Sequence, residues 1–434
     1  ITQDNSPLYI VDGFASETGL KGISPMDIES IDILKDASTT SIYGARGANG
    51  VVLVTTKSGK AGTMKVAYNG YVGFKSLPKS YDVMNSTDYV RLQYEMALRA
   101  ETPDTFTENY GTYADIDKNY GSRGLDWQDI MFGGNALYHS HNFSVSGGSQ
   151  KHKYMISYTH DSEDGILMNT SNRRNTFRVK FEQNLAKGLD LRTNVTFYQN
   201  KKQGEITSGN TLNKALQYRP VANIDASEDE LIDAIEDPIG NSLQNPKASQ
   251  LSQLRQRTNK NLTMDAVLSY RFLKDKMTLT VSGSGSWGDG RTDAFDDATS
   301  SAAGTKGGPF GSQKYDEKFQ WQNTNTLSYA DSFGKHHLNV MLGNELVFTQ
   351  SRSLKAANNQ FPDDNFGIYD LSLGSLPQKP ESSFDETGLV SYFARAFYNF
   401  DDRYLLTMTL RTDGSSKFAK ENRFGWFPSA SAAW

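Results

Sequence analysis

The sequence predicts a mainly β protein, a transmembrane antiparallel β-barrel of which about 12 strands are present, preceded by a small α+β module. Three observations predict it. Apolar residues alternate with polar ones along successive segments. The connections between these segments alternate between short and long. Aromatic residues gather beside the short connections.

The period-two segments begin near residue 64. In one of them Tyr154, Ile156 and Tyr158 alternate with Lys153, Met155 and Ser157. Each apolar face is about ten residues long, which is the length that a tilted strand needs to cross a bilayer. The expected strands are 64–75, 138–147, 151–161, 172–184, 189–200, 260–272, 276–287, 316–330, 336–348, 387–400, 403–412 and 422–434.

The connections separate a membrane barrel from a soluble sheet. Short turns such as 148–150 and 401–402 face one side of the predicted membrane. Long loops face the other side, and we expect them to be extracellular: 76–137, 201–259, 288–315 and 349–386. Outer-membrane barrels have this asymmetry, whereas a soluble sandwich has no reason to keep it. Residues 63–434 are therefore predicted to be barrel.

Composition agrees with this class. Hydrophobic content is 37% and aromatic content is 12%, and no run of about 18 apolar residues encodes a membrane helix. The absence of cysteine excludes disulfides and thiolate metal sites. A net charge of −5 without a basic block argues against nucleic acid as a partner, whereas the apolar strand faces predict contact with outer-membrane lipid.

Residues 1–62 have a different pattern. An apolar strand, 8–11, ends at Asp12-Gly13, and Ser24-Pro25 begins a helix with Ser as the cap and Pro at the first helical position. A glycine-rich loop, 44–50, precedes the buried strand 51–56. Because the loop spacing is not that of a phosphate-binding motif, we interpret its glycines as a tight turn.

This module resembles the plug of the SusC/RagA family of TonB-dependent outer-membrane transporters. The resemblance lies in 7–13, 27–38 and 42–57, with further family-like residues at 126–129 and 423–429. It implies a barrel of about 22 strands filled by the plug. It also implies TonB-dependent import of a large nutrient, an oligosaccharide or a peptide, with a SusD-like surface lipoprotein as partner.

The resemblance also implies which residues form the plug signature, with a structural or gating role. They are Asp12, Gly13, Lys35, Asp36, Tyr43, Gly44, Arg46, Gly47, Asn49 and Gly50. Charged residues of a plug lie inside a polar lumen, so we expect Lys35, Asp36 and Arg46 to form salt bridges with the barrel. Compared with the family, a signal peptide, the TonB box, the first part of the plug and the later strands are missing. We therefore expect a fragment, with TonB acting through a segment outside it.

Other candidate sites are weaker. His139 and His141 share one strand face, which we interpret as structural or interfacial rather than as a metal site. Asp293, Asp296 and Asp297 lie in an expected loop but lack the EF-hand spacing. Four aromatic residues near the long loops are candidate contacts to substrate or lipoprotein: Trp287, Phe295, Phe310 and Tyr315.

No defensible catalytic arrangement is found in the sequence, so we expect neither an enzyme nor a cofactor. One alternative is a passive porin or surface adhesin without energy coupling, which would not need the plug-like module. A second is a soluble carbohydrate-binding β protein, in which the apolar strand faces would turn inward. The substrate stays open at this point.

Overall fold

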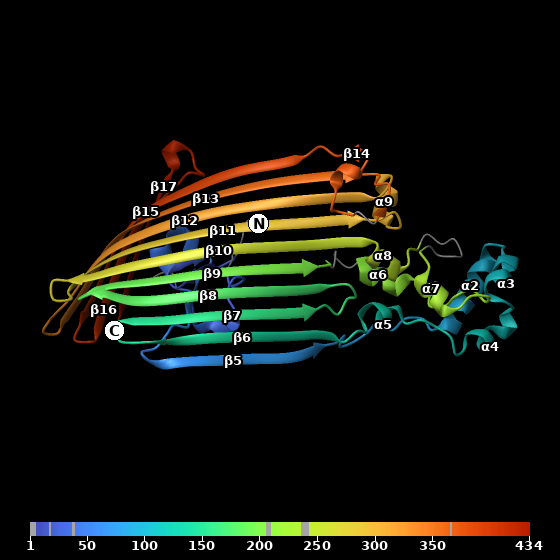
Figure 1. Cartoon of the computed structure of the whole chain (residues 1–434), viewed down its shortest axis with the longest axis horizontal. Coiled ribbons are helices and arrows are strands. Elements are labelled where there is room, and N and C mark those ends of the chain that lie inside the picture. Colours follow the sequence, from blue (N-terminus) through green and yellow to red (C-terminus); the bar gives the residue numbers. More distant parts are fainter. Residues whose placement is uncertain (1–5, 17–18, 37–39, 205–209, 236–242, 365–366) are drawn as a thin grey trace.

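The fold is that of a computed structural model, which describes residues 6–16, 19–36, 40–204, 210–235, 243–364 and 367–434. It contains one large sheet of 13 strands, one small sheet of four strands, and helices gathered at one end of the large sheet (Figure 1). None of the helices in these ranges is long and apolar enough to cross a bilayer.

The large sheet is antiparallel, and its strands are neighbours in chain order. They are β5 (Gly62–Lys75), β6 (Ala136–Gly148), β7 (His152–Asp164), β8 (Ser171–Ala186), β9 (Leu189–Gln203), β10 (Gln253–Phe272), β11 (Met277–Asp296), β12 (Phe310–Phe333), β13 (His336–Asn359), β15 (Glu381–Phe400), β16 (Tyr404–Ser415) and β17 (Phe424–Ala433), with β14 (Leu376–Pro377) beside β13. The twelve long strands match the twelve predicted ones, which confirms the predicted fold class.

The two faces of the sheet differ in polarity. Large apolar side chains are exposed on the outer face, among them Phe143, Phe177, Met264, Leu279, Trp321, Leu342 and Met408. Buried polar side chains lie on the inner face, among them Ser157, Arg178, Asn194, Gln322, Ser391 and Arg411. A soluble sandwich would pack its apolar faces against each other as a core. The observed polarity is the reverse and suits a wall with lipid outside.

Five strands extend well beyond their predicted bounds. β10, β11 and β15 have 20 residues each, and β12 and β13 have 24 each. The expected loops 288–315 and 349–386 are therefore wrong in extent, because the connections are only 297–309 and 360–380. Beyond the membrane, both faces of each strand meet water. The sequence there no longer alternates between apolar and polar residues, although the backbone hydrogen bonds between strands continue.

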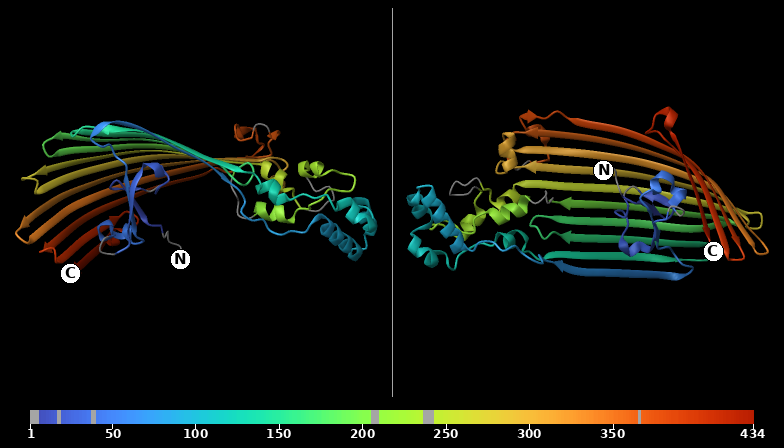
Figure 2. Two further views of the ribbon diagram at one scale, coloured as in Figure 1. Left: turned by 90° about the horizontal axis from the view of Figure 1, so that it is seen from below. Right: turned by 180° about the vertical axis from the view of Figure 1, so that it is seen from behind.

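The small sheet belongs to the N-terminal module, the plug. Its order is β2-β1-β4-β3, formed by β1 (Leu8–Val11), β2 (Phe14–Ser16), β3 (Ile28–Leu34) and β4 (Val51–Thr56). Two 3₁₀ segments join them, η1 (Pro25–Asp27) and η2 (Ser41–Gly47). Figure 2 shows this module against the concave side of the curved large sheet. The plug thus lies where a barrel lumen would be.

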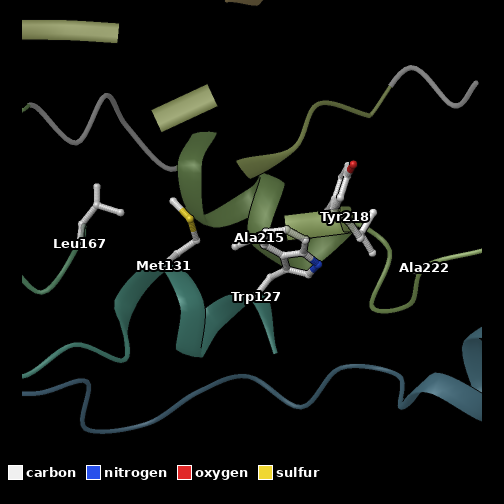
Figure 3. Close-up of a cluster of buried hydrophobic side chains, with 7 residues drawn as sticks. Trp127, Met131, Leu167, Ala215, Tyr218 and Ala222 are labelled. Carbon is white, nitrogen blue, oxygen red and sulfur yellow. The ribbon is translucent and has the colours of Figure 1, made fainter. Parts of the chain in front are cut away.

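Two of the expected loops fold together into a helical subdomain. The first carries α2 (Ser86–Arg99), α3 (Pro103–Tyr110), η3 (Tyr113–Asp115), α4 (Ile116–Tyr120) and α5 (Trp127–Phe132), and the second carries α6 (Asn210–Gln217), α7 (Glu228–Asp233) and α8 (Pro246–Leu251). Trp127 and Met131 from α5 pack with Ala215 and Tyr218 from the second loop (Figure 3). The remaining short elements are α9 (Ser301–Lys306), η5 (Leu371–Leu373) and η6 (Lys420–Asn422).

Candidate functional site: the contact between plug and wall

The first contact between plug and wall begins at a tight hairpin. Asp12 and Gly13 form the two-residue connection between β1 and β2, and both have positive φ, 50° and 100°. An Asp-Gly pair suits this geometry because glycine adopts positive φ without strain. The turn also directs the Asp12 carboxylate to β4, where it accepts a hydrogen bond of 3.0 Å from the Thr56 amide.

Asp12 then joins the plug to β8. Its carboxylate lies 3.2 Å from the Arg178 guanidinium and 3.3 Å from the Lys180 ammonium. Arg178 is only 3% exposed and also bonds the Thr56 hydroxyl. One half-buried carboxylate therefore pairs with two buried cations on a single strand. We call Asp12, Thr56, Arg178 and Lys180 the β8 anchor.

A neutral hydrogen-bond donor lies next to the β8 anchor. The Ser157 hydroxyl on β7 donates to Asp27 at 2.7 Å, and both residues are buried. Asp27 is held at the end of η1, whose first amides are capped by the Ser24 side chain as the Ser-Pro pattern predicts. Plug and wall thus contact each other at two adjacent strands, β7 and β8.

The second contact lies on β13 and β16. Arg46 of the plug pairs with Glu345 on β13. Glu345 also pairs with Arg411 on β16 at 2.7 Å, and Arg411 pairs with Asp413 at 2.6 Å. Two plug backbone groups join the network, because the Ala45 amide donates to Asp413 and the Ile42 carbonyl accepts from Arg411. We call Arg46, Glu345, Arg411 and Asp413 the β13–β16 anchor.

Gly44 lets the plug backbone approach this wall. Its φ is +58°, and a Cβ added there would lie 2.1 Å from an Asp413 carboxylate oxygen and 2.6 Å from Arg411 Nε. No side chain larger than hydrogen fits such a position. The plug-signature glycine is therefore required by contact with the wall as well as by the turn.

Between the two anchors, plug and wall enclose a small cavity of about 80 Å³. Its plug side is apolar, formed by Val11, Phe14 and Ile23, and its wall side is polar, formed by Asn194, Asp265, Ser284 and Gln322 of β9 to β12. Asp265 accepts hydrogen bonds from Ser284 at 2.6 Å and from Asn194 at 3.0 Å. The cavity residues are not part of either anchor.

The other plug-signature residues have different positions. Lys35, Asp36 and Asn49 are exposed. Gly47 is buried in η2, and Gly50 has φ +91° beside Leu34. Tyr43 is half-buried, and burial raises the pKa of its hydroxyl, with the nearby Glu345 carboxylate raising it further. Of the three charges expected to pair with the barrel, Arg46 pairs with Glu345, and for the exposed Lys35 and Asp36 the pairing stays a prediction.

The four candidate aromatic contacts do not form one site. Trp287 and Tyr315 are exposed on the outer face rather than toward the lumen, and their contact with substrate or lipoprotein stays a prediction. Phe295 is buried against Phe361 and Ile368. Phe310 lies beneath the Lys306 ammonium, 3.6 Å from the ring centroid. Period-two counting from Leu279 and Val281 places Trp287 outward, a step that the sequence prediction omitted.

The weaker metal candidates also have other surroundings. His139 and His141 lie on the outer face with their ring centroids 5.2 Å apart. Asp296 pairs with Arg255 at 2.5 Å and with Lys306 at 3.1 Å, and Asp293 pairs with Arg291. Within the described ranges, no group of three or more His, Asp or Glu side chains is arranged to hold a metal ion.

Sequence reasoning missed the wall half of both anchors. None of the wall residues Arg178, Lys180, Glu345, Arg411 and Asp413 was singled out as a candidate. A signal was available. A charged side chain on the lumen side of a membrane strand needs a partner, and a plug is the nearest source of one.

The comparisons with known proteins agree with this geometry. Residues 2–51 match the family model described as the TonB-dependent Receptor Plug Domain. The chain is 28% identical to TonB-dependent receptor SusC of Bacteroides thetaiotaomicron and 28% identical to TonB-dependent receptor P3 of Formosa agariphila, in both cases over 100% of its length. These alignments cover 44% and 42% of the relatives, so the chain spans less than half the length of the relatives it matches.

Solved structures share the fold. The structure of the RagAB peptide transporter superposes with a TM-score of 0.83 at 23% identity, covering 99% of this chain and 51% of the other. The ferric citrate transporter FecA superposes with a TM-score of 0.54 at 10% identity, covering 98% of this chain and 50% of the other.

Plug and wall together define the class: a plugged β-barrel of the outer membrane. Within that class the chain is similar in sequence to the TonB-dependent receptor SusC and in fold to the RagAB structure. The relatives named above are receptors and transporters rather than enzymes.

Proposed function

We propose that the protein containing this chain imports a large nutrient, an oligosaccharide or a peptide, across the outer membrane with energy from TonB. The observation that carries the proposal is the plug itself, held against the inner wall at the β8 anchor and the β13–β16 anchor. A passive pore has no need of a separate module joined to its wall by buried ion pairs. A receptor that opens on demand needs a plug that is held firmly and released as a unit.

The anchors suit a gate because their strength depends on burial. A buried ion pair adds little net stability over an apolar contact, but separating its partners leaves unpaired charges and costs several kcal/mol. The plug therefore stays in place without TonB, and water entering the separated interface lowers the cost of unpairing. In this proposal TonB acts through a segment outside the chain, and cargo passes the displaced plug.

We also propose a SusD-like lipoprotein as the partner at the extracellular end. The relatives that support this are SusC and the RagAB complex. On this chain the helical subdomain of α2 to α8 extends beyond the wall at the end with the long connections (Figure 1). Its position would place it next to a protein that caps the barrel.

A reversible cross-link between plug and wall tests the proposal. Asp27→Cys and Ser157→Cys would place two thiols where the native side chains are hydrogen-bonded, and this chain contains no cysteine of its own. In full-length protein expressed in cells, oxidation should abolish nutrient uptake and reduction should restore it. Each single variant, treated identically, serves as the control. Uptake that continues with the plug covalently attached would refute gating by plug movement.

A further inference from the structure

A polar hollow of about 1260 Å³ lies on the inner face of the wall, on the side of the plug that faces the long connections. Lys21 of the plug borders it, and the rest of its lining comes from β7 to β15. Tyr198 is the single aromatic side chain among the described lining residues, and none of them is aliphatic. A cargo held here would meet amides, hydroxyls and charges.

Four cations cross this hollow at one level. Lys202 on β9 is directly opposite Arg257 on β10, and Lys314 on β12 is directly opposite Lys355 on β13. Thr292 on β11 lies between the two pairs in the same register. Neighbouring strands are about 4.8 Å apart, so this cation row spans roughly 20 Å. We use the name cation row for Lys202, Arg257, Lys314 and Lys355.

The two halves of the cation row differ in whether their charges form ion pairs with acidic side chains. Lys314 pairs with Asp316 at 2.7 Å, and Lys355 pairs with Glu381 at 3.3 Å. Lys202 and Arg257 form no ion pair with any residue that the structure describes, and Arg257 bonds only the neutral Asn259 side chain, at 3.4 Å. Like charges directly opposite on paired strands are destabilising. An anionic ligand bound between Lys202 and Arg257 would offset the repulsion between these two cations.

The wall between the cation row and the plug is open to such a ligand. On β11 the inner-facing positions are Gly288 and Gly290, beside Asn261 and Asn259 on β10. An added Cβ at either glycine would lie 3.3 Å from the neighbouring amide side chain. The glycines therefore leave a shallow trough, and its edge presents amide groups that hydrogen-bond to hydroxyls.

We infer that this trough and the cation row bind an acidic oligosaccharide, with Lys202 and Arg257 contacting its carboxylate or sulfate groups. The inference rests on the proposed import function and specifies its substrate class. Charge-assisted hydrogen bonds bind the anionic groups, and the asparagines bind sugar hydroxyls. An acidic peptide would satisfy the cations as well, but none of the described lining residues is aliphatic, so the hollow has no aliphatic pocket for its other side chains.

The test measures binding by calorimetry to full-length receptor purified with its lipoprotein. The probes are a galacturonate hexamer, a sulfated galactan hexamer, the galacturonate hexamer with its carboxyls reduced to alcohols, and a hexameric aspartate peptide. The test variant is Lys202→Gln/Arg257→Gln. The control is Arg173→Gln/Lys201→Gln, which removes two charges from an opposed pair on the outer face of β8 and β9.

We expect one of the acidic saccharides to bind, and the test variant to bind it at least about tenfold more weakly at low salt, while the control binds normally. The carboxylate and sulfate probes distinguish the two sources of anionic groups. Stronger binding of the reduced hexamer, binding of the peptide alone, equal loss in the control, or no binding of any saccharide would overturn the inference. Import as such is judged separately by the plug cross-link, whose result does not depend on cargo charge.

Discussion

The two anchors hold the same plug by different arrangements. In the β8 anchor, one plug carboxylate, Asp12, serves two cations on one wall strand. In the β13–β16 anchor, one plug guanidinium, Arg46, joins a network in which the wall residues Glu345, Arg411 and Asp413 already pair with each other. The first anchor depends on a single plug charge, Asp12, whereas the wall charges of the second largely compensate each other without Arg46.

This difference indicates how the anchors should respond to damage. Removing Asp12 leaves two buried cations without the plug carboxylate that pairs with them, which is the costly case for a buried ion pair. Removing Arg46 leaves Glu345 paired with Arg411. The β8 anchor should therefore be the more sensitive of the two, and the β13–β16 anchor the more tolerant.

Asp12→Asn should have the largest effect. We expect it to weaken docking of the plug by about 3–5 kcal/mol, because Arg178 and Lys180 lose the charge that compensates them. The rate of limited proteolysis of the plug in full-length protein measures the undocked population. Glu29→Gln, which removes an exposed plug carboxylate, is the matched control. Similar proteolysis of the two variants would contradict the proposed importance of the β8 anchor.

Gly44→Ala should come second, at about 3 kcal/mol. The added methyl group would overlap Asp413 and Arg411, and the positive φ would strain an alanine. The same proteolysis assay applies, with Gly13→Ala as the comparison, because a Cβ at Gly13 has positive φ but meets no atom within 4 Å. If Gly44→Ala and Gly13→Ala had equal effects, backbone strain alone would explain both, and the proposed steric overlap of Gly44→Ala with the wall would be contradicted.

Arg46→Gln should be milder, at about 2 kcal/mol, because Arg46 is about one-quarter exposed and Glu345 keeps a second partner. A double-mutant cycle with Glu345→Gln isolates the direct coupling between the two residues. Additive effects in that cycle would mean that the observed ion pair contributes nothing. An effect larger than that of Asp12→Asn would reverse the ranking of the anchors.

Ser157→Ala should have the smallest effect, about 1 kcal/mol, through loss of one hydrogen bond to Asp27. Ser162→Ala, another buried serine of β7, controls for removal of a hydroxyl from the strand. Loss of more than about 3 kcal/mol would indicate that the contact on β7, rather than Asp12, dominates this side of the plug.

The sequence predicted the strands better than the contacts. All twelve long strands were predicted because lipid on one side and a polar lumen on the other impose a period of two. A helix cap was also readable, since the predicted Ser24 cap with Pro25 at the first position is present at η1. The membrane signal stops where both faces meet water, which is why β10 to β13 and β15 were predicted too short.

The plug–wall pairs had no comparable local signal. Asp12 and Arg178 are 166 residues apart, and Arg46 and Glu345 are 299 apart. The resemblance to a plug identified Asp12, Gly44 and Arg46 but not the residues that they contact. The packing of the loop from α2 to α5 against the loop from α6 to α8 was equally invisible, because each carries only part of the shared core.

By itself the sequence determined the alternating faces of the wall, the tight turns of the plug and the class of protein, because each is encoded by residues close together in the chain. The tertiary structure decided which charges meet, since curvature of the sheet brings β8, β13 and β16 around the same small module. It also decided that Lys202 and Arg257 stand side by side, because strand register aligns residues that the connection of α6 to α8 separates in the chain.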